Sequence, residues 1–182
     1  MKSILIILSI MAVSSASIAQ GKYFTRDGHI KFFSSTTMED IEADNHKVTM
    51  VIDESTGKME ISALVKSFEF EKALMQEHFN ENYMESTTYP KATFKGTVKD
   101  FKKGAYNTPT EVIAAGDLTR HGVTKAVEIP GTIAVKDGAY RLESKFLVKP
   151  ADYDIVIPNT VSDKIANEIE VMVDADLNPL KK

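Results

Sequence analysis

Apolar and polar side chains alternate along most of the chain between Tyr23 and Leu177. A period of two is that of a β-strand with one buried and one exposed face, whereas an amphipathic helix repeats every ~3.6 residues. The clearest run covers residues 59–66, where Leu64 is the one exception. Asp137-Gly138 stands between two alternating runs and predicts a tight β-hairpin. The pattern therefore predicts an all-β chain.

About eight alternating runs occur along the chain. They lie near residues 29–34, 46–53, 59–66, 91–99, 112–118, 127–135, 140–148 and 165–174. The interval 71–84 breaks the pattern, because its apolar residues are nearer to helical spacing, and Pro90 follows shortly after. One short helix or helical turn is expected there. Antiparallel strands joined by short turns form either a β-sandwich or a closed barrel, and both stay open at this point.

Very small residues occupy several positions on the faces expected to be buried. They are Ala63, Gly96, Ala114, Gly116 and Gly131. A simple packed core favours larger side chains, because unfilled volume costs stability. In a barrel of about eight strands, small inward residues leave room for one ligand, as in lipocalins. The alternative is that these residues only permit tight bends of the strands.

The N-terminus has the layout of a secretory signal peptide. Lys2 precedes a largely apolar run, Ile4–Val13, interrupted by Ser9, and mostly small residues follow up to Ala19. An apolar run of ten residues is short of the ~20 that a membrane-spanning helix needs. We expect cleavage between Ala19 and Gln20, which gives a signal peptide over 1–19 and one domain over 20–182. The mature protein is expected in the periplasm or outside the cell, without a transmembrane segment.

Composition and motifs argue against several classes of function. The chain has no Cys, which excludes disulfides and thiolate sites, and its formal net charge of −4 argues against binding to nucleic acid. His29, His46, His78 and His121 are too widely spaced for a local metal motif, although a site assembled from distant positions stays open. No catalytic or cofactor-binding fingerprint occurs. We expect no enzyme, no cofactor and no metal site.

Two stretches of the chain carry distinctive motifs. The first is His78-Phe79 followed after a short interval by Tyr-Pro-Lys-Ala-Thr-Phe-Lys-Gly, residues 89–96, and the second is Gly-Asp-Leu-Thr-Arg-His-Gly-Val-Thr-Lys, residues 116–125. Both resemble segments of the YceI-like family. The second is the more specific, since it looks like the family's Gly-Asp-Leu-Thr-x-x-Gly-Val-Thr-Lys signature. The chain departs from the family's pattern at residues 28–35 and 150–153. The resemblance is strong from residue 67 to 135 and looser elsewhere.

The resemblance implies an antiparallel, lipocalin-like β-barrel of about eight strands with one short helix. It also implies export to the periplasm and an interior that binds a polyisoprenoid or another long amphiphile. An apolar tunnel gains about 0.8 kcal/mol for each CH₂ group that it removes from water, so a long chain binds without precise polar contacts. The expected partner is therefore a lipid or polyisoprenoid ligand, and a homodimer stays open.

The candidate binding residues are those expected to point inward from the strands. They are Ile61, Ala63, Val65, Phe94, Val98, Ala114, Leu118, Val127, Phe146, Val148 and Ile169. Arg120, His121 and Lys125 are candidates to meet a phosphate or carboxylate head group at the barrel mouth. The favoured alternative is that the segment around them only builds a tight hairpin corner, with the basic residues solvated.

The aromatic residues around the helical interval allow two interpretations. Phe68, Phe70, Phe79, Tyr83 and Tyr89 form either a lid over one end of the barrel or part of its ordinary core. The sequence as a whole predicts an exported binding protein that holds a lipid without catalysis. The alternative is a stress-related or protein-interaction module whose barrel is filled by its own side chains.

Overall fold

Eight β-strands account for more than half of the described residues, as the sequence predicts. The computed structural model describes residues 21–180, so the predicted signal peptide, 1–19, lies outside the described residues. The strands are β1 (Lys22–Ser35), β2 (Asp40–Asp53), β3 (Lys58–Leu64), β5 (Lys91–Val98), β6 (Thr110–Arg120), β7 (Val123–Lys136), β8 (Ala139–Val148) and β9 (Ile169–Pro179). In this part of the chain, no helix has the length and apolar character needed to cross a membrane.

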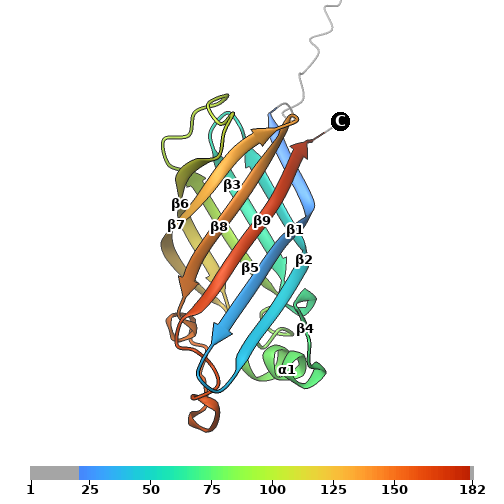
Figure 1. Cartoon of the computed structure of the whole chain (residues 1–182), viewed down its shortest axis with the longest axis vertical. Coiled ribbons are helices and arrows are strands. Elements are labelled where there is room, and N and C mark those ends of the chain that lie inside the picture. Colours follow the sequence, from blue (N-terminus) through green and yellow to red (C-terminus); the bar gives the residue numbers. More distant parts are fainter. Residues whose placement is uncertain (1–20, 181–182) are drawn as a thin grey trace, which may run out of the picture.

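The sheet closes into a barrel, and the predicted fold class is confirmed. The strands follow the order β1-β9-β8-β7-β6-β5-β3-β2, and β1 pairs with β2 as well as with β9. Every one of these pairings is antiparallel. Figure 1 shows the tilted strands wrapping around a common interior. The β-sandwich that the sequence left open is therefore excluded.

Tight turns join most neighbouring strands. Asp137 and Gly138 have φ angles of 52° and 80°, which is the type I′ geometry predicted for the β7–β8 hairpin. His121 and Gly122, with φ angles of 48° and 74°, make the same kind of turn between β6 and β7. Positive φ at both turn positions matches the right-handed twist of the flanking strands. These turns set the register that determines which residues face the interior.

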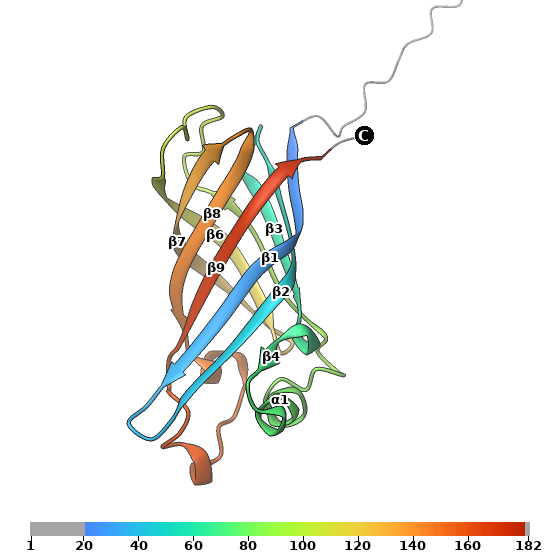
Figure 2. The ribbon, with the colours of Figure 1, turned by 45° about the vertical axis from the view of Figure 1, so that its right-hand side comes forward.

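Two longer connections cover the same end of the barrel (Figures 1 and 2). The β3–β5 connection contains η1 (Val65–Ser67), β4 (Glu69–Phe70), α1 (Ala73–His78) and the π-helical turn η2 (Phe79–Tyr83). The helix predicted within 71–84 is thus present. The β8–β9 connection contains η3 (Pro150–Tyr153) and η4 (Asn159–Val161). Its backbone N–H at Ala166 donates to Ser34 Oγ at 2.9 Å, which ties it to the end of β1.

The strand limits differ from the expected ones in several places, most of all at the starts of β1 and β2. β1 and β2 begin at Lys22 and Asp40, well before the runs at 29–34 and 46–53. Their early parts were missed because register shifts between the two strands break the regular alternation. Ile165, expected in the last strand, lies in the connection that precedes β9.

A bulge in β2 is stabilised by a buried asparagine. His46 and Lys47 lie opposite His29, between the Ile30–Asn45 and Gly28–Val48 pairs. Two residues facing one is the definition of a β-bulge, and it leaves ladder groups without their usual partners. The Asn45 side chain, which is fully buried, accepts from Lys47 N at 2.9 Å and donates to Leu64 O at 3.0 Å. Asn45 thus replaces hydrogen bonds that the bulge removes.

Replacement of Asn45 by Leu should lower the free energy of unfolding by about 1–3 kcal/mol, because two backbone groups lose their partner. Urea unfolding followed by circular dichroism measures this change. The matched control is Asn107→Leu at an exposed loop position, which should change stability by less than ~0.5 kcal/mol. Equal losses in the two variants would show that Asn45 has no special role.

Candidate ligand cavity

The barrel interior is divided between a packed half and a hollow half. One core cluster of large side chains fills the packed half. Its essentially fully buried members include Tyr140, Met50, Ile52, Ile133 and Leu177. Toward the end covered by α1, a cavity of about 580 Å³ remains. This volume falls within the roughly 300–1,000 Å³ typical of sites for small organic ligands. The hollow half is therefore the candidate binding site.

Ten of the eleven predicted inward residues line this cavity. They are Ile61, Ala63, Val65, Phe94, Val98, Ala114, Leu118, Phe146, Val148 and Ile169. Val127 is the exception, although it is half-buried. Val127 is in register with Gly116, and Gly116 is in register with Gly96. On the inner face, the Phe94 ring lies over Gly96, at the end of this row of three residues. Whether the ten residues contact a ligand stays a prediction.

The small inward residues serve two different purposes. Ala63, Ala114 and Gly131 line the cavity, as expected if small side chains leave room for a ligand. Gly96 and Gly116 form a cross-strand pair outside the cavity lining. A Cβ atom on Gly116 would collide with the carbonyl oxygen of Lys95, so close approach of the two strands requires glycine there. Gly131 fits both interpretations, because a Cβ atom there would also meet a backbone oxygen, Glu143 O, at 2.6 Å.

Four phenylalanine rings form a cluster in the cavity wall. Phe32 lies 5.4–5.5 Å, centroid to centroid, from Phe68, Phe70 and Phe79. Phe68, Phe70 and Phe79 come from the β3–β5 connection that covers this end. Their side chains line the cavity, as does Tyr83, whereas Tyr89 packs against the His121 ring at 4.7 Å. Of the five aromatic residues predicted near the helix, four therefore face the cavity.

Several lining residues were missed by the sequence analysis. Phe32 and Ile30 alternate along β1 and could have been recognised by their period of two. Ile155, Ile157 and Ile165 also line the cavity, but they belong to the β8–β9 connection. Irregular backbone carries no periodic signal, so their inward position follows only from how the connection folds over the barrel end.

The mouth of the cavity combines charged and exposed apolar groups. Lys72 Nζ lies 3.1 Å from Glu39 Oε1, and both residues line the opening together with Lys164. Met38, Leu74 and Val156 are 64%, 61% and 77% exposed. These three come from the β1–β2 turn, α1 and the β8–β9 connection, which meet at the same end of the barrel.

Arg120 is the predicted head-group residue that reaches the cavity. Its guanidinium lies 4.2 Å from the centre of the Tyr153 ring, and Nη2 donates to Lys149 O at 3.2 Å. Its Nε atom is buried and has no hydrogen-bond partner among the described residues. Burial lowers the pKa of Arg120 to about 10, so the group keeps its charge at neutral pH. Arg120 is not a solvated corner residue.

His121 and Lys125 do not line the cavity. His121 Nδ1 lies 3.0 Å from Tyr153 O, and Nε2 lies 3.5 Å from Glu85 Oε1. Lys125 is 44% exposed at its side chain, with Nζ 3.7 Å from Asp152 Oδ1. Both residues belong to the hairpin corner of the alternative, but only Lys125 is solvated as that alternative expects, since the His121 side chain is only 10% exposed.

A second cluster of polar side chains lies on the outer wall, away from the cavity. Among the described residues, His29, Asp44 and His46 bring together donor atoms that could hold one metal ion. The sequence spacing gave no sign of this group, because its members come from two neighbouring strands.

The Arg120–Tyr153 contact should stabilise the fold measurably. A double-mutant cycle of Arg120→Met and Tyr153→Leu should give a coupling energy of about 2 kcal/mol, the value for a desolvated cation–π pair. Lys125 Nζ lies 6.0 Å from the same ring and is more exposed. The control cycle with Lys125→Met should therefore give about 0.5 kcal/mol. Chemical denaturation of the variants measures both values, and equal couplings would contradict the assignment.

Comparisons with known proteins agree with this architecture. A solved polyisoprenoid-binding domain from Saccharophagus degradans has a TM-score of 0.75 and 15% identity, covering 88% of this chain and 99% of that domain. BcnA of Burkholderia cenocepacia has a TM-score of 0.68 and 17% identity, over 82% of this chain and 94% of its own. The YceI protein of Campylobacter jejuni has a TM-score of 0.56 and 15% identity, over 99% and 94%.

Sequence comparison alone gives a second, independent result. No curated protein sequence matches the chain significantly. The profile of the YceI-like domain, in contrast, matches residues 12–177, which include every strand of the barrel except the last two residues of β9. The chain therefore belongs to the YceI-like family.

Proposed function

We propose that the protein binds a long amphiphilic lipid, of the polyisoprenoid class, in the hollow half of its barrel, and that it performs no chemistry on it. The observation that carries this proposal is the apolar cavity of about 580 Å³. Its wall is built mostly from aliphatic and aromatic side chains on strands. The solved domain of the same fold from Saccharophagus degradans is described as polyisoprenoid-binding.

The composition of the wall favours a chain over a compact polar ligand. Each CH₂ group taken from water into such a cavity contributes about 0.8 kcal/mol, so affinity grows with the buried length of the chain. Ala63 and Ala114 widen the cavity between strands, while the phenylalanine cluster narrows it at the α1 end. A flexible, methyl-branched chain can follow such an uneven wall more easily than a rigid planar molecule.

The lipid enters, in this proposal, at the end covered by α1 and the β8–β9 connection. The exposed apolar residues Met38, Leu74 and Val156 belong to the segments that meet at this end, where an apolar chain would first meet the protein. Arg120, the last residue of β6, lines the cavity at this same end, and a ligand oxygen could accept from its Nε–H, which has no partner among the described residues. The lipid's polar group thus has one cationic donor within the cavity and a charged rim at the mouth.

The alternative function requires a barrel filled by its own side chains. The packed half of the interior fits this description, but the half beneath α1 does not. A protein-interaction module does not require an apolar cavity, whereas nine of the ten predicted residues that line this one lie on strands. The cavity is thus the observation that favours a lipid carrier.

Replacement of Ala114 by Phe should reduce lipid binding at least about 10-fold, because the ring would occupy the cavity. Ala115→Phe is the matched control: Ala115 is in register with Thr97 and Glu128 and does not line the cavity. Native mass spectrometry of detergent-free protein, before and after addition of a polyprenol, measures the bound fraction. Gly116 is unsuitable for this test, since a side chain there collides with the backbone.

Two results would contradict the lipid-carrier proposal. One is a folded parent protein that is purified without lipid and does not take up polyprenols or long acyl chains. The other is equal lipid binding by Ala114→Phe and Ala115→Phe. In the first case the protein-interaction module becomes the better explanation of the fold.

Export is part of the same proposal, supported by the charged residue and apolar run at the N-terminus. Expression in a Gram-negative bacterium should give periplasmic protein whose intact mass lacks residues 1–19. Replacing Ala19 by a bulky residue, for instance Ala19→Phe, should slow this processing, because signal peptidase reads small residues before the cut. Full-length protein confined to the cytoplasm would contradict the proposal.

A further inference from the structure

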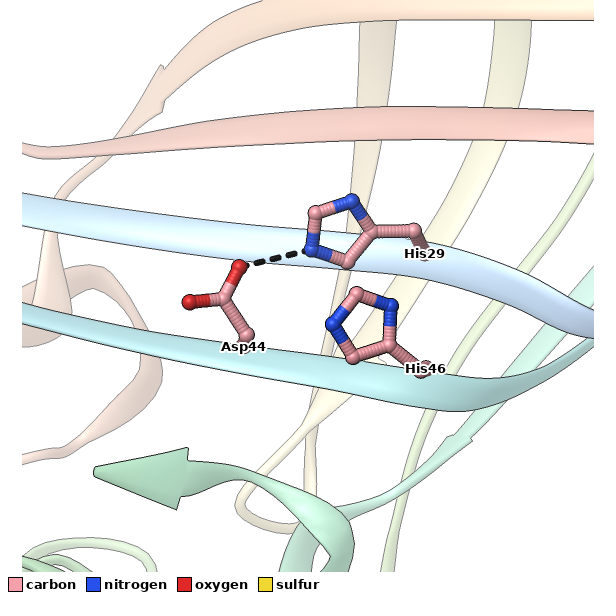
Figure 3. Close-up of side chains that lie close together, drawn as sticks. All are labelled: His29, Asp44 and His46. Atoms are coloured by element: carbon pink, nitrogen blue, oxygen red, sulfur yellow. Dashed lines mark hydrogen bonds and ion pairs between the residues drawn. The ribbon is translucent and has the colours of Figure 1, made fainter. Parts of the chain in front are cut away.

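His29, Asp44 and His46 form a compact cluster on the outer wall of the barrel (Figure 3). His29 Nε2 lies 2.7 Å from Asp44 Oδ1, and the two imidazole rings stack with centroids 4.2 Å apart and planes 13° from parallel. One donor atom from each residue lies within 4.8 Å of the other two. Two imidazoles and a carboxylate are the ligand types that zinc and neighbouring transition metals prefer.

The β-bulge explains why these side chains meet. Asp44 and His46 are two residues apart on β2 and point to the same outer face, while Asn45 between them is buried. The bulge places His46 opposite His29 of β1. Figure 3 shows that one nitrogen of each ring is turned toward the side on which the Asp44 carboxylate lies. The backbone thus directs three donors toward one region.

We propose that this cluster binds one divalent transition-metal ion, with Zn²⁺ as the reference ion. Nitrogen and oxygen ligands lie at about 2.0–2.2 Å from zinc, so donors that already gather within 4.8 Å of one another need only small side-chain movements to share an ion. The metal replaces the hydrogen bond between His29 Nε2 and Asp44 Oδ1. Three protein ligands leave at least one coordination position open to water, since the cluster faces solvent.

The surrounding charges are mixed and, on balance, compatible with a cation. Glu69 of β4 is in register with Asp44, and Asp174 of β9 is in register with His29. Asp174 is held by Arg141, which also pairs with Glu143 and Asp176. Lys31 is the nearest competing cation on β1, but its Nζ is bound to Glu42 Oε2 at 2.6 Å. Among the described residues, two carboxylates near the cluster are therefore not held by Lys or Arg: Asp44 and its register neighbour Glu69.

The metal site and the lipid cavity are separate. Ile30 of β1 lines the cavity. Because neighbouring residues of a strand point to opposite faces, His29 and the cluster lie on the outer face. A bound ion would join β1 to β2 at the bulge, where the ladder between them is irregular. An ion that binds only the folded state raises its stability by mass action. The proposal therefore does not depend on lipid binding.

Isothermal titration of untagged mature protein with zinc sulfate tests the site. We expect one ion per chain and an affinity at least about 10-fold weaker in His29→Ala and in His46→Ala, since loss of even a supporting residue costs 10–100-fold. His78→Gln, on α1, is the matched histidine control and should bind zinc as the parent does. Zinc should also raise the thermal unfolding temperature of the parent and of His78→Gln only.

Asp44→Asn provides a second test, because it keeps the shape and a hydrogen-bond acceptor but removes the charge. Its zinc affinity should fall while its circular dichroism spectrum stays that of the parent. Zinc binding that is equal in the parent, His29→Ala and His46→Ala would overturn the proposal. The absence of saturable binding below millimolar zinc would do so as well.

Discussion

Pairing of β1 with both β9 and β2 closes the sheet, and every other feature of the protein depends on this closure. Because no long strand keeps an open edge, almost all backbone groups of the wall are bonded within the barrel, and the two faces of each strand become inside and outside. The interior can therefore stay partly hollow, because the hydrogen bonds of the wall hold its shape even where side chains do not fill the core. Closure is helped by register shifts between β1 and β2, where a bulge accommodates the bend.

Within the closed wall, side-chain size decides what is filled. Large buried residues such as Tyr140, Met50 and Leu177 fill one half of the interior. In the other half, Ala63 and Ala114 leave volume that aromatic residues from the β3–β5 connection surround but do not fill. The same fold thus contains a conventional core, which provides stability, and a cavity, which provides the candidate function. A barrel needs both, because apolar burial is what stabilises the wall around an unfilled space.

The bulge in β2 has consequences on both faces of the wall. On the inside, the fully buried Asn45 provides hydrogen bonds that the irregular ladder lacks. On the outside, the same irregularity brings His46 opposite His29 and beside Asp44. The same bulge therefore requires the stabilising hydrogen bonds of Asn45 and creates the proposed ion site. Bulges commonly redirect side chains in this way at functional positions.

The sequence by itself determined the strands, the hairpin at Asp137-Gly138, the helical interval and ten residues that line the cavity, because a period of two, a two-residue turn and apolar side chains are local properties. It missed Ile155 and Ile157, since irregular connections have no period. It could not show that Val127 lies outside the cavity lining. It also could not separate Gly116, which permits close strand approach, from Ala114, which leaves space. Only the tertiary structure decided that the sheet closes, that half of the interior stays hollow and that His29 meets His46, because each of these depends on which distant strands become neighbours.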